Sequence, residues 1–178
     1  MLKINSNKIK LILFTFTTYL FCLNSIYASP LVGDMAEYEV THFKNNQTIK
    51  EKYSTKIEII EYKKDFEVFT LQVTNFKNTQ ESSQVELGPD EILSEQQLSD
   101  LLVACGTDQA PGTRREKISV RAGNFDSCHS DNFEEEGKLI GSTNFGLVPF
   151  GVIKQTELLS DGEKIQVELI KFYKAPSF

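Results

Sequence analysis

The chain has 178 residues, of which 40% are hydrophobic, and its 19 basic and 25 acidic residues give a formal charge of −6. This negative charge makes nucleic acids and anionic membrane surfaces poor partners. The 150 residues after position 28 suit a single domain, which would bury roughly 70% of its unfolded surface.

The first 28 residues have the layout of a secretory signal peptide. A basic segment that ends at Lys10 precedes an apolar run, residues 11–23, and Ala28 offers a small side chain at the cleavage position. A single membrane anchor is the alternative, but the apolar run is shorter than the roughly 20 residues of a spanning helix. We therefore expect residues 1–28 to be removed, and 29–178 to form one β-rich domain in the periplasm or outside the cell.

Alternating apolar and polar residues predict β-strands through most of the remaining chain. In the first strand, alternate residues from Ala36 to Val40 share one face, and in the second a change of face near Ile59 indicates a bulge. The pair Asp161-Gly162 separates two apolar runs and is typical of a type I′ hairpin turn. The nine expected strands cover residues 35–43, 48–62, 66–76, 83–87, 117–122, 125–135, 138–143, 152–160 and 163–173.

One helix is expected to interrupt these strands. Ser94 and Gln97 have the spacing of a capping box, in which each side chain satisfies a backbone N–H at the helix start. Gly106 stands where a glycine would end the helix. We expect this helix to cover the sheet, with a mobile lid as the alternative. Its apolar stripe has the i, i+3, i+4, i+7 spacing of one helical face and consists of Leu98, Leu101, Leu102 and Cys105.

Two cysteines remain once Cys22 leaves with the signal peptide. An even number in an exported chain favours a disulfide between Cys105 and Cys128, and two buried thiols are the alternative.

No stretch carries a catalytic or cofactor motif: the chain has no nucleophile elbow, no zinc-binding HExxH and no glycine-rich phosphate loop. The densest polar cluster surrounds His129 and Asp131, which share one face of a strand. They could help to hold a metal ion only if another strand supplied ligands; otherwise they form a solvated strand end. We expect no cofactor, no metal and no enzymatic activity.

The C-terminal third resembles a family of known fold. The run KISVRAGNFDSCH, the apolar link GLVPFG with the VIK that follows it, and a last strand ending in LIKFY are ordered as in a group of bacterial envelope proteins. That group is similar in layout to the LolA, LolB and LppX lipoprotein-carrier superfamily. The resemblance covers residues 118–173. It implies a curved, incompletely closed antiparallel sheet and a helix that covers an apolar concavity holding acyl chains, although this chain has fewer helical segments.

The expected protein is therefore mainly β, an incomplete barrel of about nine strands with one packed helix. The leading hypothesis is a non-enzymatic envelope protein that binds or carries an apolar, lipid-like ligand, with lipid or a lipoprotein as its partner. The alternatives are a structural or interaction protein with a self-filled core, and thirdly a hydrolase. The apolar link, residues 146–151, should pack inward or contact a lipid or partner. The candidate lining residues are Phe69, Leu71 and Val73 of the sheet, Leu98, Leu101 and Leu102 of the helix, and Leu147 and Phe150 at the rim.

Overall fold

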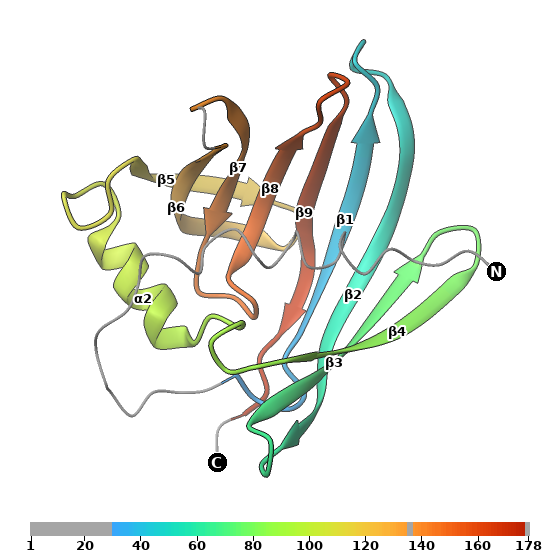
Figure 1. The fold of residues 1–178 in the computed structure, drawn as a ribbon, viewed down its shortest axis with the longest axis vertical. Coiled ribbons are helices and arrows are strands. Elements are labelled where there is room, and N and C mark those ends of the chain that lie inside the picture. The colour runs from blue at the N-terminus through green and yellow to red at the C-terminus, as the bar shows by residue number, and fades with distance from the viewer. Residues whose placement is uncertain (1–29, 135–136, 177–178) are drawn as a thin grey trace.

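The computed structural model describes residues 30–134 and 137–176, so the expected signal peptide lies outside the described part. The described residues form one nine-stranded sheet and one helix, α2, Glu95–Ala104 (Figure 1). The strands are β1 Met35–Phe43, β2 Ile49–Lys63, β3 Val68–Phe76, β4 Gln80–Leu87, β5 Thr113–Val120, β6 Gly123–Phe133, β7 Leu139–Phe145, β8 Val152–Leu158 and β9 Lys164–Tyr173.

The sheet is antiparallel throughout, and its strand order is β4-β3-β2-β1-β9-β8-β7-β6-β5. The two edge strands, β4 and β5, are not paired with each other, so the sheet does not close into a barrel. The expected fold class, a mainly β protein with one helix on an incompletely closed sheet, is confirmed.

One long connection, residues 88–112, joins the two edge strands, and we call it the strap. It runs across one face of the sheet and carries α2 (Figure 1). We call this the inner face and define it by Ala36, Tyr38 and Val40, whose side chains are buried. Ile92 and Leu101 of the strap belong to the same buried cluster. The hydrophobic core therefore lies between the strap and the inner face.

The ends of α2 follow the sequence prediction. Ser94 Oγ accepts a hydrogen bond from Gln97 N at 3.2 Å, and Ser94 N donates to Gln97 Oε1 at 2.8 Å, so the capping box is confirmed. Cys105 is the C-cap, and Gly106 follows with a φ of +76°, a conformation that glycine adopts without steric cost. Of the predicted apolar stripe, Leu98, Leu101 and Cys105 are buried and Leu102 is half-buried.

The β5–β6 hairpin crosses the sheet beyond its own neighbour β7 and reaches β9 (Figure 1). Ala122 N donates to Leu169 O at 3.3 Å, and the Arg121 guanidinium pairs with Glu39 of β1 at 2.7 Å. The four consecutive residues 127–130 of β6 are all buried. Because neighbouring side chains of a strand point to opposite faces, both faces of β6 are covered there.

Both edge strands begin several residues earlier than the sequence predicted. β4 begins at Gln80 rather than residue 83, and β5 begins at Thr113 rather than Lys117. The first residues of both strands are polar. In β4, for example, Ser82 Oγ lies 3.1 Å from Thr74 Oγ1 of the neighbouring strand β3. Apolar alternation, on which the prediction rested, does not detect such segments. The bulge expected near residue 59 is confirmed by a register shift in the pairing of β2 with β3.

The β8–β9 hairpin exists as predicted, but the prediction of a type I′ turn is wrong. Such a turn needs positive φ at both central residues, whereas in Asp161-Gly162 only Gly162 has one, at +81°. Leu159 N donates to Glu163 O, and Gly162 N donates to Leu159 O. The connection is therefore a longer loop, in which a turn is followed by a left-handed glycine.

The apolar link of residues 146–151 packs inward at Val148 and Phe150, which are buried, while Leu147 is 43% exposed. Gly151 has a φ of +75°, and a Cβ added there would lie 2.5 Å from Leu98 Cδ2 of α2. The link thus forms part of the surface on which α2 rests, and only a glycine allows this close approach.

Candidate functional site

A cleft lies on the inner face near the β1–β2 and β8–β9 hairpin loops. These two loops are at the top of Figure 1. Its volume is about 360 Å³, at the lower end of the range for small-molecule sites. No residue of the strap lines it. We call it the open-end cleft, and it is lined by Val40, His42, Glu51, Tyr53, Lys77, Gln155, Glu157, Leu159, Ile165 and Val167.

Strand register explains why these side chains meet. Residues that are paired directly across neighbouring strands lie side by side on the same face. The inner row across β2, β1, β9 and β8 is Tyr53, Val40, Val167 and Gln155. The outer row, nearer the hairpin loops, is Glu51, His42, Ile165 and Glu157. The cleft therefore has a mainly apolar floor and a more polar outer row.

Within the described residues, three polar atoms on the inner face have no hydrogen-bond partner: Gln155 Oε1, the Tyr38 hydroxyl and His42 Nε2. The carbonyl oxygen Oε1 of Gln155 is buried, and the whole residue is only 7% exposed. Tyr38 lies on the same face of β1 as Val40, two residues before it. Its hydroxyl is also buried without a hydrogen-bond partner in the described residues, and this burial raises the pKa of the phenol. A buried polar atom without a partner costs about 1–3 kcal/mol, so native structures contain few of them.

Ion pairs surround the mouth of the cleft. His42 Nε2 lies 3.0 Å from Glu163 Oε2, at an angle that does not make a hydrogen bond. Lys50 Nζ lies 2.7 Å from the same carboxylate oxygen, and this hydrogen bond raises the pKa of Lys50.

Lys77 pairs with Glu51, and its ammonium lies 5.6 Å from the ring centroid of Tyr53. Burial, followed by the charge of Glu51, raises the pKa of the Tyr53 phenol. The lysines beside the cleft are thus held by carboxylates that belong to the protein.

The other end of the inner face is largely filled. Four of the candidate lining residues are buried in the core: Phe69, Leu71, Val73 and Leu101. They line neither the open-end cleft nor a second, smaller cleft on the same face. Leu98 and Phe150 line a second cleft of about 290 Å³, between α2, the apolar link and the two ends of the described chain. Leu102 is half-buried and lines a separate cleft beside β5 and β6. The eight candidate lining residues are therefore dispersed, and none of them borders the open-end cleft.

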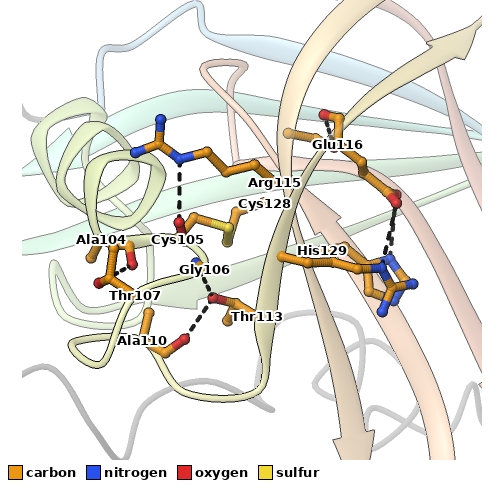
Figure 2. Close-up of a disulfide and its surroundings, with 12 residues drawn as sticks. Ala104, Cys105, Gly106, Thr107, Ala110, Thr113, Arg115, Glu116, Cys128 and His129 are labelled. Atoms are coloured by element: carbon orange, nitrogen blue, oxygen red, sulfur yellow. Dashed lines mark hydrogen bonds and ion pairs between the residues drawn. A yellow bond between two sulfur atoms is a disulfide. The ribbon is translucent and has the colours of Figure 1, made fainter.

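The strap is fastened at the C-terminal end of α2, and the expected disulfide is confirmed (Figure 2). Cys105 and Cys128 form the bridge, and both are almost completely buried. The Arg115 guanidinium donates to Val103 O at 2.7 Å and to Cys105 O at 3.2 Å. Arg115 thus satisfies carbonyl groups that a helix end leaves unpaired. These contacts hold the strap over β5 and β6.

His129 lies on the face of β6 opposite Cys128, and it is buried rather than solvated. Its Nε2 lies 3.0 Å from Asp131 Oδ1, and its Nδ1 lies 3.4 Å from Glu116 Oε1. The hydrogen bond with His129 lowers the pKa of the Asp131 carboxyl. Asn144 donates to both Glu116 and Ser127, which completes a network across β5, β6 and β7.

This network does not have the geometry of a hydrolase relay. Such a relay places one imidazole nitrogen on a hydroxyl and the other on an acid. Both nitrogens of His129 face carboxylates, and the Ser127 hydroxyl donates to the backbone oxygen of Glu116 at 3.1 Å. Within residues 30–134 and 137–176, no group of three His, Cys, Asp or Glu side chains is arranged to hold a metal ion. The same residues contain no helix that is long and apolar enough to cross a membrane.

Neither a protein-family model nor a curated protein matches this sequence. Among solved structures, a protein classed as exported, with a YmcC-like fold, from Bacteroides fragilis aligns over 85% of this chain and 100% of its own, at 7% identity and a TM-score of 0.46. MucB, solved in complex with MucA(peri), aligns over 82% of this chain and 52% of its own, at 8% identity and a TM-score of 0.43.

A LolA superfamily protein from Nitrosomonas europaea aligns over 94% of each chain, at 8% identity and a TM-score of 0.36. A member of the superfamily whose layout this chain was expected to share is thus among the structural matches. At these TM-scores the likeness carries no argument about function, which must come from the chain's own residues.

Sequence reasoning did not select the residues of the open-end cleft. Gln155 and Glu157 are polar residues of β8, and polar strand residues normally face solvent. They lie on the inner face because Gln155 pairs with Val167 and Glu157 pairs with Ile165. A usable signal was present in Gln155 itself, because it shares a strand face with the apolar Ile153.

Proposed function

We propose that this protein is an exported, non-enzymatic binding protein that holds the apolar part of a small lipid-like molecule in the open-end cleft. The observation that carries the proposal is the inner face itself: the strap covers one end, whereas at the other end a cleft of about 360 Å³ has no strap residue in its lining. Val40, Ile165 and Val167 supply its apolar surface. Concave, mainly apolar sites with a few convergent polar groups are typical of small-molecule binding.

Two features support export. The basic and apolar segments before Ala28 have the layout of a signal peptide. The buried Cys105–Cys128 bridge is of the kind that forms and persists in oxidising compartments such as the periplasm. A carrier in that compartment would shield an apolar ligand from water.

A structural envelope protein with a self-filled core is the second candidate. The strap end favours it, because the buried side chains of Ile92, Leu98, Leu101 and Phe150 fill much of the inner face there and leave a smaller cleft of about 290 Å³. The two candidates differ in whether the open-end cleft takes up a ligand.

The test uses mature protein purified without detergent. Its organic extract is examined for lipid by mass spectrometry, and the stripped protein is titrated with the neutral fluorescent probe N-phenyl-1-naphthylamine. We expect saturable binding. We also expect Ile165→Phe, which fills the cleft, to weaken binding at least about fivefold. Ile170→Phe is the matched control, since Ile170 is a half-buried isoleucine of the same strand that does not line the cleft. No extracted lipid together with no saturable binding would leave only the structural role.

A further inference from the structure

The chemistry of the open-end cleft indicates which polar end its ligand carries. Gln155 lies at the end of the inner row, where its backbone is fixed by pairing with Val167. It is 7% exposed, lines the cleft, and its Oε1 has no donor in the described part of the chain. An amide oxygen accepts hydrogen bonds and cannot donate them. A bound group that donated an N–H or O–H would satisfy this oxygen, whereas a group with acceptors only would leave it unpaired.

Charge around Gln155 points the same way. The charged side chains that line the cleft are Glu51, Glu157 and Lys77. Lys77 is already paired with Glu51, and its ammonium lies over the ring of Tyr53. The mouth adds Glu163, whose carboxylate binds both Lys50 and His42. A ligand carboxylate or phosphate would therefore have to displace one of these acids from its partner, or lie beside carboxylates without a cation of its own.

We propose that the ligand is an amphiphile whose polar end donates a hydrogen bond to Gln155 Oε1 and carries no negative charge, such as an alcohol or an amide. This inference rests on the proposed function, because it assigns the head group of a molecule whose apolar part occupies the same cleft. The apolar part lies against Val40, Ile165 and Val167, and the donor reaches Gln155.

The experiment compares three ligands with the same ten-carbon chain as competitors of bound N-phenyl-1-naphthylamine at pH 8. Decanol can donate a hydrogen bond, decyl methyl ether can only accept one, and decanoate is an anion. Decanol and the ether are kept below their solubility limits, and decanoate below its critical micelle concentration. We expect decanol to bind about fivefold to tenfold more tightly than the ether, which is the factor that one neutral hydrogen bond contributes. We expect decanoate to bind most weakly.

The variant Gln155→Met keeps the length of the side chain and removes the amide. It should abolish the preference, so that decanol and the ether bind equally well. Gln72→Met is the matched control, because Gln72 is a half-buried glutamine of β3 that does not line the cleft, and it should keep the wild-type preference.

The outcomes separate the two proposals. If the probe and all three ligands fail to bind, the proposed function is lost and this inference with it. If all three ligands bind equally, or if decanoate binds best, the binding function stands and the head-group assignment is overturned. The wild-type ranking decides the assignment even if Gln155→Met does not fold.

Discussion

Removing the disulfide should cost about 3 kcal/mol of unfolding free energy. The bridge joins positions 23 residues apart, and closing a loop of that length removes roughly 11 cal/mol/K of entropy from the unfolded chain, about 3 kcal/mol at 25 °C. The change is made in two ways, by the double substitution Cys105→Ala with Cys128→Ala and by reduction of the wild-type protein. Reduction keeps both sulfur atoms in the core, so the two forms separate loop entropy from lost packing.

The assay is urea unfolding followed by circular dichroism, for the oxidised protein, the reduced protein and the double variant. Both altered forms should lose about 3 kcal/mol, and their urea dependence should steepen because the unfolded chain exposes more surface without the bridge. α2 should stay helical in both, since Arg115 still binds the carbonyls of Val103 and Cys105. A loss below about 1 kcal/mol in both forms would refute the loop-entropy reasoning. A loss in the double variant alone would assign the effect to packing.

Three further predictions concern other parts of the chain. Gly151→Ala should cost about 2–4 kcal/mol in thermal or urea unfolding, because it combines a positive φ with a Cβ only 2.5 Å from a leucine of α2. Gly112→Ala, at a φ of +77° with nothing within 4 Å, should cost only about 1–2 kcal/mol, and equal losses would contradict this account. Asp131 has a lowered pKa through His129, so its contribution to stability should be present above its unfolded pKa, near 3.8, and should disappear as pH falls through the lower folded value. Urea unfolding of Asp131→Asn should therefore differ from wild type at pH 6, and the difference should shrink as the pH falls below 3.8. A gap independent of pH would argue against the ionic contribution. N-terminal sequencing of the mature protein should find a start within a few residues of Ser29, and an intact Met1 in a membrane fraction would reject the signal peptide.

Local features of the sequence predicted much of the fold. The capping box of Ser94 with Gln97 and the glycine after Cys105 act within a few residues of each other, so they can be read without knowing the fold. The period-2 alternation of β1 assigned Tyr38 and Val40 to the buried face correctly for the same reason. The disulfide was inferred from the number of cysteines in an exported chain, since two cysteines allow one pairing.

Features that depend on contacts distant in sequence were decided by the tertiary structure. Gln155 lines the cleft because it pairs with Val167, which in turn pairs with Val40. Alternation along one strand does not determine which strands lie beside it. His129 became part of a buried network because β5 begins early enough to bring Glu116 beside β6. The strap crosses the sheet once, near the β5–β6 edge that anchors it. It therefore covers one end of the inner face and leaves the other end uncovered. Sequence periodicity shows which face of a strand is apolar, but the three-dimensional path of the chain decides what covers that face.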